Sequence, residues 1–307
     1  MRNIQGKFSN NLKVILSYWQ LYALLLPAII YVFIFSYIPM YGVQIAFKDY
    51  RTSIGIWGSK WVGFKNFKRF VTFPNFWLYI KNTMSISIYS ISTFPCSIIL
   101  ALSINELQKA KFKRFVQMIT YAPHFISTVV LCGMIHIFLD RNSGIVNTLI
   151  KALGGTAIPF MSKPQCFRSI YVWSGVWQGI GWGTIIYIAT LAGIQQELVE
   201  AARIDGANRF HIIRHINIPH IMPTVMILLI MNFGSILSVG FHKIYLLQNP
   251  LNLSVSQVIS TYVYQVGLIS GQFSYSAAIG LFNTAINLSL LIIVNLIVKK
   301  ASSISLW

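Results

Sequence analysis

Six long runs without a charged residue alternate with short polar segments along the 307 residues of this chain. The runs cover residues 14–47, 82–105, 115–139, 169–196, 215–242 and 244–298, and each holds the ~20 apolar residues with which a helix crosses a membrane. The last run is long enough for two spans, but residues 248–276 are rich in Asn, Gln, Ser and Gly, so we place one helix there. The pattern predicts an all-α integral membrane protein whose six transmembrane helices cover about 19–44, 83–105, 116–138, 170–193, 220–241 and 277–298.

Composition supports a membrane protein. Only 10% of the residues are charged, against about a quarter in a typical soluble domain, and the mean hydropathy is +0.64. The first uncharged run is too long for a signal peptide, whose apolar core has roughly 7–15 residues, so we expect an uncleaved first helix after a segment of residues 1–18. The net charge of +18 does not indicate nucleic-acid binding, because no basic stripe with interleaved aromatic residues is present. The three cysteines show no spacing typical of disulfides or metal sites.

One polar, basic loop between the fourth and fifth runs has a pattern of its own. Residues Glu197–Ile204 predict a short helix, and Asp205-Gly206 is a strong turn signal. Apolar residues then recur with helical spacing up to Ile218. We expect two short helices that meet at Gly206 in a compact knob, with Pro219 near the start of the next element. Such a knob fits a groove of a partner protein; the alternative is an ordinary hairpin between two spans.

The loop also carries a motif: Glu200, Ala201, Ala202, Gly206, Ile216 and Pro219 stand at the spacing of the EAA motif, with Ile218 in place of its leucine. The chain therefore resembles the membrane subunits of binding-protein-dependent ATP-binding cassette (ABC) importers. The resemblance implies the type I importer permease fold, in which residues 194–219 form a cytoplasmic EAA coupling loop. It further implies a bacterial cell membrane, cytoplasmic segments at residues 1–18 and 299–307, and coupling to an ATPase through Glu200, Ala201, Ala202, Asp205, Gly206, Ile216 and Pro219. Counts of positive residues on the two sides are equal and do not decide the orientation.

Several other segments resemble permeases that import oligosaccharides derived from complex polysaccharides and glycans. They begin at Asp140, Trp177, Ile204 and Ile259, together with the ending Ser305-Leu-Trp. The resemblance implies a second, different permease, two ATP-binding subunits, a lipid-anchored or extracytoplasmic solute-binding protein, an oligosaccharide substrate and contact with membrane lipid. The basic segment from Lys48 to Lys81 suits either an acidic sugar or an acidic binding protein, and the sequence leaves both open.

The sequence contains no Gly-x-x-x-x-Gly-Lys-Ser/Thr loop, so we expect no ATP site, no cofactor and no enzymatic activity in this chain. ATP and Mg²⁺ would belong to the partner. The alternative of an ion-coupled secondary transporter is disfavoured because all six acidic residues lie outside the predicted spans or at their edges. The histidines form no catalytic or metal-binding pattern; His211 and His215 share a helical face but have no third ligand.

A passage for sugar needs amides and aromatic faces inside the helix bundle. Our candidates for the substrate path are Asn283, Asn287, Asn232, Trp173, Trp177 and Gln178. The alternative is that the amides join helices by hydrogen bonds and the tryptophans anchor at the membrane interface. We expect close helix packing to explain the glycines at 175, 179, 181 and 183.

Overall fold

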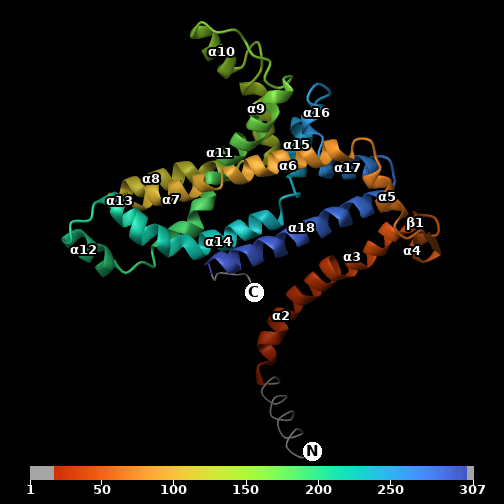
Figure 1. The fold of residues 1–307 in the computed structure, drawn as a ribbon, viewed down its shortest axis with the longest axis horizontal. Coiled ribbons are helices and arrows are strands. Elements are labelled where there is room, and N and C mark those ends of the chain that lie inside the picture. The colour runs from red at the N-terminus through yellow and green to blue at the C-terminus, as the bar shows by residue number, and fades with distance from the viewer. Residues whose placement is uncertain (1–16, 303–307) are drawn as a thin grey trace, which may run out of the picture.

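The computed structural model describes residues 17–302, and these are almost entirely helical (Figure 1). The segments 1–16 and 303–307, which include most of the expected N-terminal segment and the ending Ser305-Leu-Trp, lie outside the described residues. The first helix runs without interruption through four segments, α2 (Trp19–Val32), η1 (Phe33–Tyr37), α3 (Ile38–Met40) and η2 (Tyr41–Phe47). It has almost no buried residues and leans away from the other helices (Figure 1).

The remaining long helices form a bundle. They are α6 (Phe76–Ser92), α7 (Pro95–Asn105), α8 (Ala110–Tyr121), α9 (Thr128–Phe138), α11 (Pro164–Leu191), α14 (Ile218–Gly234) and α18 (Phe273–Ser302). Shorter elements connect them: α4 (Gly55–Gly58), α5 (Lys65–Val71), η3 (Ala122–Phe125), α10 (Ile145–Ala152), α12 (Gln196–Ile204), α13 (Arg209–Ile212), η4 (Ile213–Asn217), α15 (Phe241–Leu247), α16 (Leu253–Ser256), α17 (Ile259–Tyr264) and η5 (Gln265–Ile269).

Four helical stretches in residues 17–302 are long and apolar enough to cross a membrane: 19–47, 76–105, 209–234 and 273–300. A fifth is obtained if α8 with η3 is joined to α9, although the two parts meet at 97°. The 28 residues of α11 span about 42 Å, but its Trp, Gln, Ser and Gly residues keep it outside this apolar set. These spans support a multi-pass membrane protein and do not establish the expected count of six.

Two expected helices differ from the observed ones. The single helix expected at 116–138 is wrong, because the chain bends sharply between Phe125 and Thr128. Pro123 lies in the 3₁₀ turn before the bend, and the hydroxyl of Ser127 caps the new helix by accepting from the Val130 N–H at 3.3 Å. The helix expected at 220–241 ends early, at Gly234, and residues 235–240 are not helical.

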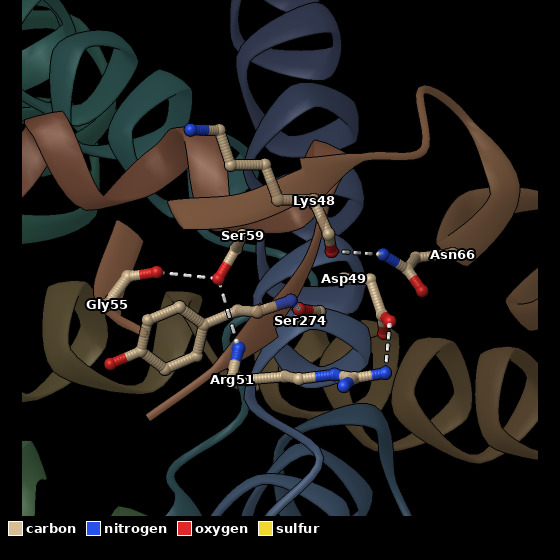
Figure 2. A network of polar contacts seen from close by, with 8 residues as sticks. Lys48, Asp49, Arg51, Gly55, Ser59, Asn66 and Ser274 are labelled. Carbon is tan, nitrogen blue, oxygen red and sulfur yellow. Dashed lines mark hydrogen bonds and ion pairs between the residues drawn. The ribbon is translucent and has the colours of Figure 1, made fainter. Parts of the chain in front are cut away.

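A small hairpin lies at one rim of the molecule. Strand β1 (Lys48–Arg51) pairs antiparallel with β2 (Ser59–Trp61). The Ser59 hydroxyl fixes the loop between them, because it donates to the Gly55 carbonyl at 2.6 Å and accepts from the Arg51 N–H at 3.1 Å (Figure 2). The Tyr50 N–H donates to the Ser274 hydroxyl at 2.8 Å, which ties the hairpin to the start of α18. The first and last helices therefore meet at this rim.

Three buried apolar clusters hold the bundle together. One joins α5, α6, α17 and α18 through Phe70, Phe76, Tyr262 and Ile279. A second surrounds Ile86 of α6 and includes residues of α9, α11 and α15. The third contains Leu102, Leu191 and Ile221, where α7, α11 and α14 meet near α12. Together they fix α11 between α6–α7 on one side and α14–α15 on the other.

Candidate functional site: a helical loop and an internal cavity

The loop 194–219 folds as a helix, a tight turn and a second helix. Gly206 follows α12 with φ +82°, a left-handed conformation that side chains with a Cβ rarely adopt. The Gly206 N–H donates to the Arg203 carbonyl at 3.1 Å and the Ala207 N–H to the Ala202 carbonyl at 2.9 Å, which closes the end of α12. Asn208 then starts α13 by accepting from the His211 N–H at 2.9 Å. The sequence folds into a turn here because glycine and asparagine stand where the backbone requires them.

We expected the second helix of the loop to be short and separate, and this is wrong. The segments α13, η4 and α14 run on as one helix from Arg209 to Gly234. Pro219 therefore lies inside a continuous helix. The π-helical segment η4 explains how this is possible: the Ile213 carbonyl accepts from the Ile218 N–H, five residues on. The wider turn accommodates the proline, which has no N–H to donate. The same arrangement recurs in the first helix, where the π segment η1 precedes Pro39.

The seven residues of the coupling motif are divided between two helices. Five of them lie on α12 and its turn, namely Glu200, Ala201, Ala202, Asp205 and Gly206, whereas Ile216 and Pro219 lie on the following helix. Glu200 is exposed. Its carboxylate makes no ion pair in residues 17–302, where the one recorded pair joins Arg51 and Asp49. The Glu200 carboxylate is therefore available to a partner.

Three large apolar side chains are also exposed on this loop. They are Leu198, Ile204, which is 87% exposed, and Phe210. No residue of α12 is buried. Figure 1 shows α12 and α13 at the left end of the molecule, far from β1 and α4 on the right and from α10 at the top. The loop thus presents a carboxylate and apolar side chains on a protruding surface.

One contact between the loop and the rest of the bundle joins two residues that sequence reasoning missed. The Asn217 amide, which is almost fully buried, donates to the Glu106 carboxylate at the end of α7 at 3.5 Å. These two residues and the guanidinium-bearing Arg203 and Arg209 line a cavity of about 140 Å³. Glu106 was recognisable as one of six acidic residues, but nothing in the sequence pairs it with Asn217.

A larger cavity of about 490 Å³ lies between α6, α7, α11, α14 and α15. Of the six candidate path residues, Gln178 and Asn232 line it. The Gln178 amide donates to the Ile126 carbonyl at 2.7 Å, across the bend between η3 and α9, and the Asn232 amide donates to Leu228 in its own helix at 2.8 Å. The amide oxygens of these two residues face no recorded hydrogen-bond donor in residues 17–302.

The other four candidates lie elsewhere. Trp173 donates through Nε1 to the Tyr89 hydroxyl at 2.9 Å, and Trp177 is about half exposed. Asn287 accepts from the Leu237 N–H at 3.0 Å and donates to the Ser238 hydroxyl at 2.9 Å, so it joins α18 to the non-helical segment after α14. Asn283 has a buried Oδ1 without a hydrogen-bond partner in the described chain. The structure does not bring the six residues together.

The glycines of α11 serve two purposes. At Gly181 a Cβ would overlap the Thr120 carbonyl, and at Gly183 it would meet the Ser97 hydroxyl at 2.7 Å, so these two positions allow close helix packing as expected. Gly175 and Gly179 line the large cavity, as Gly183 also does. No atom lies within 4 Å of a Cβ built at Gly179. At Gly179 the missing side chain leaves open space, whereas at Gly175 it makes room for the ammonium nitrogen of Lys243, which would lie 3.2 Å from an added Cβ.

A buried lysine also lines this cavity. Lys243 of α15 is 9% exposed, and its ammonium donates to the Tyr171 carbonyl at 2.8 Å. Sequence reasoning passed over it, although Lys243 is the one charged residue between Arg214 and Lys299.

Comparison with known proteins identifies the class of protein. The model of the family described as binding-protein-dependent transport system inner membrane component matches residues 93–303. This chain belongs to that family. It is 43% identical over 281 residues to Protein LplB of Bacillus subtilis, covering 91% of this chain and 88% of that protein. It is 42% identical, with the same coverage, to the polygalacturonan/rhamnogalacturonan transport system permease protein YteP of the same organism.

A solved structure gives the same result for the fold. One chain of a bacterial alginate ABC transporter in complex with an alginate pentasaccharide-bound periplasmic protein matches with a TM-score of 0.87 and 37% identity, over 96% of this chain and 99% of that chain. The protein is therefore a multi-pass permease of the sugar and oligosaccharide ABC importers, with their type I fold. The prediction from the coupling motif is confirmed at this level, and the alternative of an ion-coupled carrier is set aside.

Proposed function

We propose that this chain forms one half of the translocation path of an oligosaccharide importer, paired with a second, different permease. Two ATP-binding subunits hydrolyse ATP on the cytoplasmic side, and a lipid-anchored or extracytoplasmic binding protein delivers the sugar on the other side. The exposed, almost unburied first helix, 19–47, supports a partner within the membrane, because most of its surface has no neighbour in the described chain and only its last part, η2, packs against α18. YteP and the alginate transporter are named for polysaccharide substrates, which supports an oligosaccharide as the cargo here.

The protruding loop is the proposed contact with the ATPase. A helix without buried residues, which exposes Leu198, Ile204 and Phe210, gains stability only when a partner covers it. The turn at Gly206 fixes the direction of α12, and the Asn217–Glu106 contact links the loop to α7. A displacement imposed at α12 is thereby passed to the helices that line the large cavity. The single observation that carries this proposal is the protruding α12–α13 loop with its exposed apolar surface.

The orientation follows from this assignment. Helix α18 starts beside the hairpin, at the contact between Tyr50 and Ser274, and extends over 30 residues, about 45 Å, to Lys299 and Lys300 in its last turn. The first helix covers 29 residues and also ends at the hairpin. Both chain ends are therefore proposed to lie on the cytoplasmic side with α12, and the hairpin and α10 on the outer side.

Single cysteines at two equally exposed positions test the docking surface and the orientation together. Ile204 is 87% exposed on α12, and Leu153 is 88% exposed after α10. Each is replaced by cysteine in a variant whose three native cysteines, all free thiols, are changed to serine. In the assembled complex, Ile204→Cys should cross-link to the ATPase through a short bifunctional reagent, whereas Leu153→Cys should not.

In sealed vesicles of known orientation, a membrane-impermeant maleimide should label Ile204→Cys only from the ATPase side and Leu153→Cys only from the opposite side. Cross-linking of the ATPase at Leu153, or labelling of both positions from one side, would refute the proposed arrangement.

A further inference from the structure

Lys243 is a buried cation on the large cavity. Its ammonium nitrogen donates to the Tyr171 carbonyl at 2.8 Å and lies 4.9 Å from the centre of the Tyr171 ring. A Cβ added at Gly175 would lie 3.2 Å from this nitrogen, so the glycine makes room for it. Helix α15, which carries the lysine, lies outside the four candidate spans. Lys243 is thus held against α11 by one carbonyl and one aromatic face.

No carboxylate within residues 17–302 forms an ion pair with this ammonium. The one ion pair recorded in residues 17–302 joins Arg51 to Asp49. The ionisable neighbours of Lys243 are Tyr171 and Cys132, side chains of types that are neutral at pH 7 and supply no negative charge. Burial lowers the pKa of Lys243 to about 8, so most of the ammonium remains charged at pH 7. A buried charge is unfavourable unless it is paired, and this one has two N–H donors left after the bond to Tyr171.

The surroundings of the ammonium are suited to a sugar. The polar residues that line the same cavity are Ser90, Thr93, Ser97, Gln178 and Asn232. Hydroxyls and amides of this kind bind sugar hydroxyls. The cavity follows α11 from Tyr171 to Tyr187, and the rise along the helix between these two residues is about 24 Å. Its length suits an extended oligosaccharide, and Lys243 lies at the end of this stretch that is nearest the start of α11.

We propose that Lys243 binds the carboxylate of an acidic sugar unit as the oligosaccharide passes through this cavity, an inference that rests on the proposed function. The carboxylate supplies the anion that the described part of the chain does not place beside the ammonium, and charge-assisted hydrogen bonds of this kind are short and strong. The cargo is therefore a uronate-containing oligosaccharide, and Lys243 selects it over the neutral form inside the membrane subunit, after the binding protein has released it.

The test uses the complete importer, with its binding protein, in proteoliposomes. The probes are trisaccharides of galacturonate, glucuronate, mannuronate and guluronate, together with their methyl esters. Uptake kinetics are compared for the wild type, Lys243→Met, Lys243→Arg and Lys163→Met, the last at an exposed lysine at the start of α11 that does not line the cavity. For each probe, kcat/KM of the variant is divided by kcat/KM of the wild type. This ratio cancels the preference of the binding protein for that probe.

We expect Lys243→Met to lower kcat/KM for an imported acidic trisaccharide by about 10- to 100-fold, the range for a hydrogen bond to a charged group. For the methyl ester, Lys243→Met should change kcat/KM by less than about 2-fold. The ester carries no charge, so it does not form the interaction with the ammonium even in the wild type. Lys243→Arg should retain most of the acidic uptake, and Lys163→Met should behave as the wild type.

Equal losses for acid and ester would show that Lys243 has a structural role only and would overturn the carboxylate site. No loss for the acid would overturn it as well. A wild-type complex that imports neutral oligosaccharides but none of the uronates would exclude the acidic cargo and leave the proposed function intact. A complex that imports no oligosaccharide at all would instead contradict the proposed function.

Discussion

Replacement of Gly206 by valine should weaken the contact with the ATPase through backbone strain alone. The residue has φ +82°, and no atom lies within 4 Å of a Cβ built there, so the new side chain meets no neighbour. A non-glycine residue in the left-handed region costs roughly 1–2 kcal/mol, and a β-branched residue fits it least well. Because no residue of α12 is buried, little packing opposes this strain, and the helix can unwind or change direction.

A cost of this size corresponds to a factor of about 5–30 in an equilibrium between two states. The apparent affinity for the ATPase falls with the fraction of permease whose α12 is correctly placed. We therefore expect up to about a 5–30-fold loss of ATPase affinity in Gly206→Val, measured with the permease pair in nanodiscs, and a smaller loss in Gly206→Asn, since asparagine tolerates this conformation.

Gly154 provides a matched control at the other end of the molecule. It follows α10 with φ +84°, has no atom within 4 Å of its built Cβ, and shows the same pair of closing hydrogen bonds, from Gly154 to Lys151 and from Gly155 to Ile150. Gly154→Val should introduce the same strain and leave ATPase affinity unchanged. Unaltered affinity in Gly206→Val, or an equal loss in both variants, would refute the argument that the turn positions the docking helix.

Three further predictions concern single side chains. Glu200→Lys reverses an exposed charge on α12 and should uncouple ATP hydrolysis from uptake. The amount of sugar imported per ATP hydrolysed should fall by at least about 10-fold if the pair between Glu200 and the ATPase is buried. An equal loss in Glu197→Lys would indicate general disruption of the loop. Asn287→Leu removes the acceptor for the Leu237 N–H and should lower the free energy of unfolding by about 1–3 kcal/mol. Thermal unfolding of the complex measures this. Lost uptake at unchanged stability would instead favour a role of Asn287 in the substrate path. Hydrogen bonds from the following turn lower the pKa of Asp140, so amide protection of that turn should be constant above the ordinary pKa of about 3.9 and be lost as the pH falls through the lowered pKa. Hydrogen exchange measures it, and Asp140→Asn, which keeps the acceptor without the charge, should show no such step.

The parts of the fold that depend on local sequence were predictable. Gly206 and Asn208 specify a turn by their own conformational preferences, so the reversal after Ile204 follows from the sequence alone. The run of apolar residues that ends before Lys299 likewise predicts the last helix, because hydropathy is a property of the segment itself.

The breaks within apolar segments were not predictable from hydropathy. The bend of 97° between Phe125 and Thr128 lies inside one uncharged run. Pro123 and Ser127 signal a helix end there, yet prolines are tolerated in membrane helices, and Pro219 does lie within a continuous one. The difference is the π segment before Pro219, which keeps the chain hydrogen-bonded through the proline. Whether a proline interrupts a membrane helix thus depends on local backbone geometry, such as the π turn before Pro219, and hydropathy does not report this.

The polar residues that line the large cavity are brought there by contacts between distant segments, which the sequence alone does not show. Asn287 is a candidate because it is an amide within a predicted span, but its hydrogen bonds go to the segment that follows Gly234, 50 residues earlier in the chain. Lys243 was not chosen, yet it faces the cavity because that same non-helical segment turns α15 back against Tyr171. Helix α14 ends at Gly234, seven residues before our predicted boundary, and this early end affects both residues. The non-helical segment that follows takes up the hydrogen bonds of Asn287, and it places the Lys243 ammonium, which has no ion-pair partner in the described chain, beside the glycines of α11. A polar residue in a membrane subunit is a candidate for substrate contact only when the neighbouring backbone leaves its hydrogen-bonding groups unpaired, and by that criterion Lys243 is a stronger candidate than Asn287.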